Sequence, residues 1–205
     1  MKRIPYDVMQ VTDLLYQALE TELGGEQIYG RAVEAAVDHE LREEWTKYLS
    51  ETKHHQDVLM GVFQNLNLDP DHDTDSRRVV RHLGESLVEA IEMALRTGDS
   101  AAAQLVAGEC VVLAETKDHL NWELIGHVGE HGDGPWAKVL RAAHAEVETD
   151  EDHHLYHTKG WTRELWIEAL GFPAALPPPE EVKKVQTAIG AARAENAREQ
   201  MTDKH

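Results

Sequence analysis

The most restrictive feature of this sequence is the helical spacing of its apolar residues, which continues over long stretches between a few clusters of glycine and proline. Apolar residues recur at intervals of three and four over residues 7–36, 40–66, 79–95, 100–128 and 136–170. This spacing places them on one face of an α-helix. A half-buried strand would instead alternate apolar and polar residues, and no stretch here alternates for long enough. The sequence therefore predicts an all-α protein.

The order of these stretches predicts how the helices are connected. The first two stretches are separated by a short connection, as are the last two, so each pair is expected to form an antiparallel hairpin. Between the hairpins lies a long connection that contains the acidic loop 67–76 and an amphipathic segment of its own. We therefore expect a four-helix bundle over residues 1–172, with one long crossover that carries an extra helix. Residues 173–205 are predicted to form a proline-rich linker and a C-terminal helical appendage.

Charge and composition exclude several classes of protein. The chain has 20 Lys and Arg against 38 Asp and Glu, which gives a net charge of -18 and disfavours binding to nucleic acid or to anionic lipid. A single cysteine, Cys110, rules out a disulfide framework or a thiolate metal cluster. No apolar run is long enough to span a bilayer, and the first residues do not form a signal peptide. We expect a soluble cytoplasmic protein.

Two Glu-x-x-His motifs are the most informative polar pattern. Glu51 and His54 form the first, and Glu151 and His154 form the second. The spacing places each carboxylate and imidazole on the same face of a helix. Such motifs are expected by chance in a chain with 13 histidines and this many acidic residues, so their positions matter more than their number.

The positions of the motifs predict two further partners. Residues at equal distances from the turn of an antiparallel hairpin face one another, and reflection of the first motif reaches Glu22. Reflection of the second motif reaches the region of Glu115, with Glu109 as an alternative. Glu22 shares a heptad row with Leu15, and Glu115 shares one with Trp122, so both glutamates are expected to face the core.

Four carboxylates in one core need compensating positive charge. They cannot all ionise there unless cations neutralise them, and two divalent metal ions would supply four positive charges. Carboxylate oxygen and imidazole nitrogen without sulfur suit iron or manganese better than zinc. The sequence thus predicts a site with two iron ions, or alternatively two manganese ions.

From Asp13 to Trp161 the sequence resembles the ferritin-like superfamily of di-metal carboxylate proteins. That family takes one glutamate from each of two helices and a Glu-x-x-His pair from each of the other two. The matching residues here are Glu22, Glu51, His54, Glu115, Glu151 and His154. Tyr29, seven residues after Glu22, is similar to a tyrosine found in bacterioferritins and rubrerythrins.

The resemblance implies roles for individual residues. Glu51 and Glu151 would bridge the metals, while Glu22, Glu115, His54 and His154 would be terminal ligands. Tyr29, Asp118 and Asp150 would lie just outside the ligands.

The residues that precede the two bridging positions differ. By the resemblance, Asp150 would orient His54, whereas Ser50 stands where family members often have aspartate and would face His154. This difference implies two inequivalent metal positions. The chain also lacks the cysteines of a rubredoxin module.

The function implied by the resemblance is a redox reaction at a di-metal centre, with O2, peroxide or a small molecule as substrate. Peroxide reduction, ferroxidase activity, oxygenation and a reaction of the manganese-catalase type all remain open. The competing hypothesis is a metal-free helical bundle that acts in stress or as a scaffold through self-association. Under either hypothesis we expect a homo-oligomer.

Overall fold

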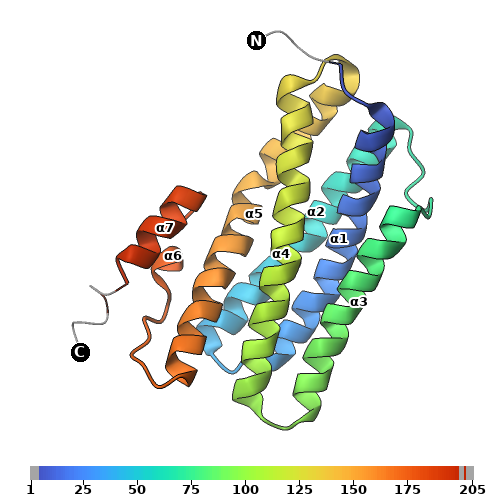
Figure 1. The fold of residues 1–205 in the computed structure, drawn as a ribbon. Helices are drawn as coiled ribbons and strands as arrows, with labels where there is room; N and C mark the ends of the chain where they lie inside the picture. The colour runs from blue at the N-terminus through green and yellow to red at the C-terminus, as the bar shows by residue number, and fades with distance from the viewer. Residues whose placement is uncertain (1–4, 199–200, 202–205) are drawn as a thin grey trace.

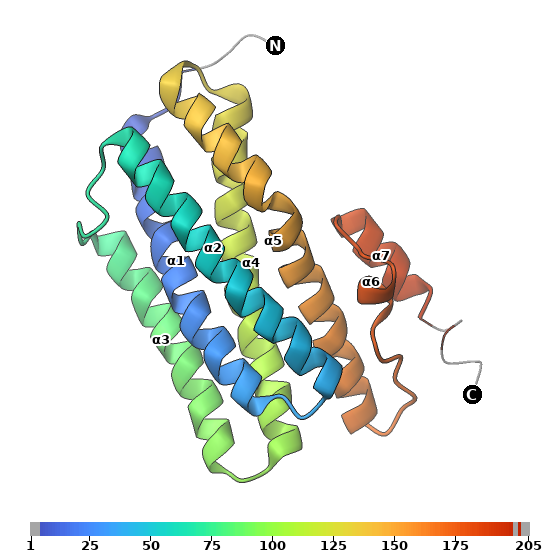
Figure 2. The ribbon, with the colours of Figure 1, turned by 180° about the vertical axis from the view of Figure 1, so that it is seen from behind.

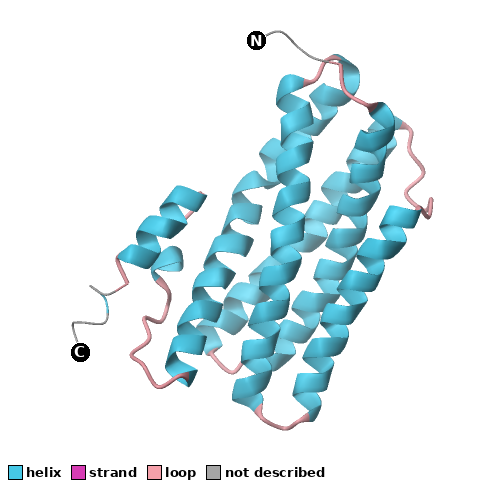
Figure 3. Cartoon of the chain, viewed as in Figure 1, coloured by secondary structure: helices cyan, strands magenta, loops and turns pink. Residues whose placement is uncertain are grey.

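The computed structural model describes residues 5–198 and residue 201, and the regular structure within them is helical (Figure 3). The prediction of an all-α protein is therefore confirmed. No helix in the described part of the chain is both long and apolar enough to cross a membrane. The described helices are α1 (Val8–Ala35), α2 (His39–Leu66), α3 (Asp75–Arg96), α4 (Ser100–His131), α5 (Gly134–Ala169), α6 (Pro179–Val182) and α7 (Ala188–Asn196).

Four long helices form a bundle of two antiparallel hairpins (Figure 1). Helices α1 and α2 form the first hairpin, and α4 and α5 form the second. Helix α3, which connects the two hairpins in the sequence, runs along one edge of the bundle and packs against α1 and α4, as both views show (Figures 1 and 2). The helix that was predicted inside the long connection is thus present.

Side-chain caps define where the long helices begin. Asp7, Asp38, Thr74 and Asp99 each precede a helix and accept hydrogen bonds from backbone N–H groups of its first turn. These N–H groups have no partner within the helix, so a cap stabilises the start of the helix. At the other end of α2, Asn67 adopts the left-handed conformation, with φ of 54°, and ends the helix.

The apolar core is divided into two clusters along the length of the bundle. One contains Tyr29, Trp45 and Trp161, and the other contains Leu15 and Trp122. On α1, the residues between Leu19 of the second cluster and Ile28 of the first include the buried Glu22. This division leaves a polar layer in the middle of the bundle.

The C-terminal segment packs against α5 through buried ionic contacts. Arg163 of α5 donates to Glu180 of α6 at 2.6 Å, and Glu180 is only 2% exposed. Glu164 of α5 accepts hydrogen bonds from the backbone N–H of Ala175 and from Arg198, each at 2.9 Å. Residues 199–200 and 202–205 of the predicted appendage lie outside the described residues. The division at residue 172 stays a prediction.

Gly160 allows this close approach, so alanine should be unfavourable there. A Cβ atom on Gly160 would lie 2.6 Å from Glu180 Oε2 and 3.1 Å from Pro178 Cβ. We expect Gly160→Ala to destabilise the protein by about 1–3 kcal/mol, because the buried Glu180 must move. The measurement is urea unfolding followed by circular dichroism.

Gly61→Ala is the matched control, because a Cβ atom at this position in α2 meets nothing within 4 Å. It should stabilise the protein by about 0.5–1 kcal/mol, the usual gain from replacing glycine inside a helix. If both variants were equally stabilised, the contact between Gly160 and Glu180 would not constrain the C-terminal segment.

Candidate metal centre

A cluster of ionisable side chains lies in the polar layer at the middle of the bundle. All four long helices of the bundle contribute to it, and each member is between 0% and 5% exposed. We call it the acidic cluster, and its members are Glu22 of α1, His55 of α2, Glu115 and Asp118 of α4, and Glu151 and His154 of α5. Charged residues are rarely buried to this extent without a partner.

Glu151 is the central member of the acidic cluster. Its Oε1 atom lies 3.0 Å from Nδ1 of His55 and 3.9 Å from Nδ1 of His154. His55 Nδ1 is also 3.4 Å from Glu22 Oε1, and His154 Nδ1 is 3.7 Å from Glu115 Oε2. The two histidines, which come from different hairpins, therefore face the same carboxylate.

The acidic cluster contains two sets of possible metal ligands that share Glu151. In the first set, ligand atoms of His55, Glu151 and His154 all lie within 4.8 Å of one another. In the second, ligand atoms of Glu22, Asp118 and Glu151 do so. Oxygen and nitrogen ligands grouped in this way are compatible with one or more bound cations.

Several polar atoms of the acidic cluster are buried without any hydrogen-bond partner. They are Glu22 Oε2, both ring nitrogens of His55, Glu115 Oε2, Asp118 Oδ1 and both carboxylate oxygens of Glu151. An unsatisfied buried polar group costs about 1–3 kcal/mol, and a charged one costs more. A bound cation would use these atoms as ligands and remove that cost.

Residues around the acidic cluster hold some of its side chains in place. Trp122 Nε1 donates to Glu22 Oε1 at 2.8 Å. Glu51 Oε2 lies 3.1 Å from Nε2 of His154, while the other nitrogen of that ring faces the cluster.

A second carboxylate faces the other histidine. Asp150 Oδ2 lies 3.7 Å from Nε2 of His55. Glu51 and Asp150 thus occupy corresponding places, each next to the histidine of the opposite hairpin. Carboxylates at such positions fix the orientation of a histidine that binds a metal.

The pKa values of the cluster reflect burial and charge. Burial, followed by the negative charge of Glu151, raises the pKa of Glu115 well above its usual value. Burial, followed by the negative charge of Glu22, raises the pKa of Asp118 well above its usual value. Burial lowers the pKa of His154. Burial also opposes protonation of His55, but Asp150, Glu151 and Glu22 outweigh it and raise the pKa of this residue.

The prediction that His54 lies in the core is wrong. Its side chain is 51% exposed, and its Nε2 atom lies 3.2 Å from Glu146 Oε1 on the outside of the bundle. The neighbouring residue His55 is completely buried instead. Successive residues of an α-helix are rotated by about 100°, so an error of one position moves a side chain from the core to the surface.

Glu51 also lies about 100° away from the buried face of α2 on which it was predicted. Its side chain is 20% exposed and contacts Lys47 and His154 at the edge of the acidic cluster. Thr52, which is 2% exposed, takes the core position that Glu51 was predicted to occupy. In the structure, Thr52-x-x-His55 of α2 therefore corresponds to Glu151-x-x-His154 of α5.

Changes around the histidines follow from this correction. Asp150 faces His55 rather than His54, and Ser50 is exposed rather than facing His154. Glu51, and not Ser50, is the residue that faces His154. Both histidines of the acidic cluster thus have a carboxylate neighbour, and the predicted difference between Ser50 and Asp150 is not present.

The other predicted site residues do come together. Glu22, Glu115, Glu151 and His154 all belong to the acidic cluster. The alternative to Glu115, Glu109, is exposed and accepts a hydrogen bond from Trp166 Nε1 at 3.0 Å.

Tyr29 and Asp118, which were predicted to lie just outside the ligands, are both found at the acidic cluster. The Tyr29 ring lies 5.8 Å from that of His154, and burial and Glu115 raise the pKa of this tyrosine. Asp118 is inside the acidic cluster rather than next to it.

His55 could have been found from the sequence by following one helical face. Most buried residues of α2 recur at intervals of three and four, in the row Leu41, Trp45, Tyr48, Thr52, His55, Leu59 and Val62. This row contains His55 and excludes both Glu51 and His54. The Glu-x-x-His motif of Glu51 and His54 lies on a neighbouring face of α2 that is partly exposed to solvent.

Neither comparison with protein-family models nor searches among curated proteins and solved structures gave a match to this chain.

The raised pKa values predict how the stability of the metal-free protein depends on pH. The folded protein keeps protons on Glu115 and Asp118 at a pH where the unfolded chain has released them. This contribution to stability is complete below the unfolded pKa values, near pH 4, and is lost as the pH rises through the raised values. The free energy of unfolding should therefore fall as the pH rises above about 4, where the unfolded chain begins to release these protons and the folded protein does not.

Asp118→Asn tests the source of this dependence, because asparagine cannot release the proton. In this variant the free energy of unfolding should fall less steeply over the same pH range. Each unit of difference in pKa between the two states corresponds to about 1.4 kcal/mol. Urea unfolding of chelator-treated protein at a series of pH values measures the slope. An unchanged slope in Asp118→Asn would contradict the prediction.

Proposed function

We propose that this chain is a ferritin-like di-metal carboxylate protein, with two divalent iron or manganese ions bound by the acidic cluster. The observation that carries the proposal is the sealed group of four carboxylates and two imidazoles at the centre of the bundle. Many of its polar atoms lack hydrogen-bond partners, which is costly unless they bind something.

The charge balance of the acidic cluster supports two divalent cations. Among the described residues, the ion pairs of Glu22, Glu115 and Glu151 are with histidines, and none is with lysine or arginine. Two divalent ions would offset four buried negative charges, whereas without such ions the cluster depends on protons on Glu115 and Asp118 and on the charge of His55. Lysine or arginine beside these carboxylates would favour a metal-free scaffold protein, and we prefer the metal-binding function because their described ion pairs are with histidines.

The choice of iron or manganese rests on ligand chemistry. The cluster offers carboxylate oxygen and imidazole nitrogen, and Cys110 lies in the apolar cluster that contains Tyr29. Such ligands suit iron and manganese, while sulfur-rich sets favour zinc or iron–sulfur clusters.

The proposed ligand set differs from that implied by the sequence resemblance at two positions. His55 replaces His54, and Asp118 supplies the carboxylate that Glu51 was expected to supply. Thr52 lies where the resemblance implies a second bridging glutamate, and Glu151 is the carboxylate that both sets of possible ligands share. The total of four carboxylates and two histidines is unchanged.

The remaining residues have positioning roles in this proposal. Glu51 and Asp150 orient His154 and His55, and Trp122 fixes Glu22. The bound metal ions would supply electron transfer to O2 or peroxide, which the side chains alone do not provide. The apolar residues on both sides of the cluster limit access of water to it.

Two neighbouring histidines give a matched test of the proposed ligands. After loading with Fe(II) or Mn(II) under anaerobic conditions and desalting, we expect elemental analysis to find two metal ions per chain in the unmodified protein. His54→Ala should keep both ions, because this side chain faces solvent. His55→Ala should lose at least one, while circular dichroism checks that it remains helical. Absence of metal from the unmodified protein, or equal metal content in the two variants, would contradict the proposal.

Glu51→Gln tests the positioning of His154 without removing a ligand. Glutamine keeps the shape of the side chain but not its charge. The His154 ring should therefore be less firmly oriented, and its basicity should be lower. We expect metal affinity to fall by about 10–100-fold, a typical loss for residues that orient metal-binding histidines. Metal titration measures the affinity. Glu146→Gln, which alters the partner of the exposed His54, should leave it unchanged.

A further inference from the structure

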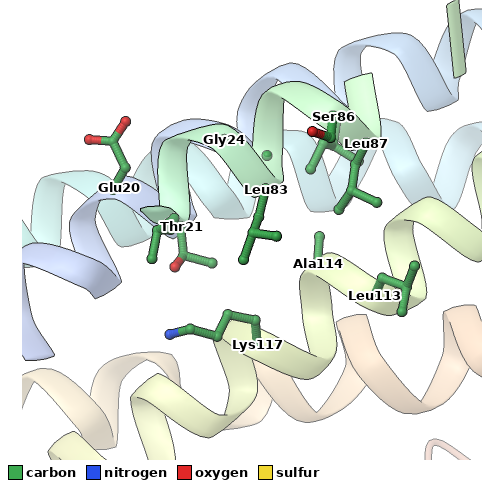
Figure 4. Close-up of a pocket in the computed structure, with 12 residues that line it drawn as sticks. Glu20, Thr21, Gly24, Leu83, Ser86, Leu87, Leu113, Ala114 and Lys117 are labelled. Atoms are coloured by element: carbon green, nitrogen blue, oxygen red, sulfur yellow. The ribbon is translucent and has the colours of Figure 1, made fainter. Parts of the chain in front are cut away.

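An apolar pocket of about 300 Å3 opens between α1, α3 and α4 (Figure 4). Its lining includes Ile28 of α1, Leu83 and Leu87 of α3, and Leu113 of α4. None of its lining residues belongs to the acidic cluster. Its volume is at the lower end of the range for small-molecule sites, roughly 300–1,000 Å3, and therefore suits a ligand with a single short chain.

The pocket is separate from the acidic cluster but lies next to it. On α1, the lining residues Thr21 and Ile28 immediately precede Glu22 and Tyr29. On α4, Lys117 of the lining immediately precedes Asp118. The pocket thus uses the neighbouring face of the same two helices, and α3 covers that face.

Lys117 is the polar group of the lining with free hydrogen-bonding capacity. Its half-buried ammonium donates to Asn121 Oδ1, which uses one of its three donor positions. Within the described part of the chain, no carboxylate oxygen lies within 4.0 Å of Lys117 Nζ. Figure 4 shows this side chain extended along one side of the pocket, below Thr21.

The other polar groups of the lining are already bonded. Glu20 is held by Arg77 at 2.5 Å and by Arg81 at 2.7 Å, so its negative charge is compensated. Thr21 Oγ1 donates to the backbone of Gln17, and Ser86 Oγ donates to the backbone of His82. A ligand in the pocket would therefore find apolar walls and one available cation.

We propose that this pocket binds a small amphiphile with an alkyl chain and a carboxylate group. The alkyl chain would pack between Leu83, Leu87 and Ile28, and the carboxylate would accept hydrogen bonds from Lys117. Burial of the chain provides affinity through the hydrophobic effect, and the charge-assisted contact provides preference for an anion. This inference does not depend on metal binding by the acidic cluster.

Isothermal titration with decanoate, compared with 1-decanol, tests the proposal. The full chain is used, at about 0.15 M salt so that the field of the net charge is screened beyond roughly 8 Å. We expect one decanoate site per chain. Lys117→Met should weaken decanoate binding at least tenfold and leave decanol binding unchanged. The absence of decanoate binding, or an equal effect of this variant on both ligands, would overturn the proposal.

Two substitutions on α3 locate the site. Leu83 lines the pocket and Val79, one turn earlier, does not, although both are exposed, at 54% and 61% respectively. Leu83→Asp should abolish decanoate binding, whereas Val79→Asp should preserve it. Equal effects of the two substitutions would overturn the assignment.

A second copy of the chain is the main alternative occupant. If light scattering showed a dimer that Leu83→Asp dissociates and that decanoate does not affect, the pocket would be part of a protein interface and the proposal would be wrong. The two proposals fail separately, because His55→Ala should lose metal but retain the decanoate site.

Discussion

The arrangement of the acidic cluster depends on the Glu151 carboxylate, which is buried between two helical hairpins. Neither of its oxygens has a hydrogen-bond partner, and imidazoles from both hairpins lie 3.0 Å and 3.9 Å from its Oε1 atom. An isolated charge in such a place would be strongly unfavourable. The apolar clusters above and below supply the burial energy that keeps the helices together, and they also remove the solvent that would otherwise stabilise this charge.

The helical architecture could be predicted from the sequence because it depends on local information. The spacing of apolar residues gave the long helices, and the short connections gave the two hairpins. The reflection argument also placed Glu22 and Glu115 correctly, because paired positions in an antiparallel hairpin depend only on distance from the turn. The amphipathic segment 79–95 was recognisable as α3 for the same reason.

The details of the cluster depend on side-chain direction, which a motif does not determine. Glu51 and His54 satisfy Glu-x-x-His as well as Glu151 and His154 do, but Thr52 and His55 are the residues on the buried row of α2. Asp118 was harder to recognise, because an aspartate three residues after Glu115 could equally well be solvated. Only the packing of α4 against α1 and α5 places it in the acidic cluster.

The origin of the cluster in two hairpins has a consequence for folding. Contacts within each hairpin are local in sequence and form quickly, whereas contacts between the hairpins require closure of a long loop. Glu22 belongs to the first hairpin, and Glu115, Asp118 and Glu151 belong to the second. Repulsion among the three carboxylates of the second hairpin arises when that hairpin forms, and repulsion with Glu22 is added when the hairpins dock. A cation that binds only the docked state would favour this late step by mass action.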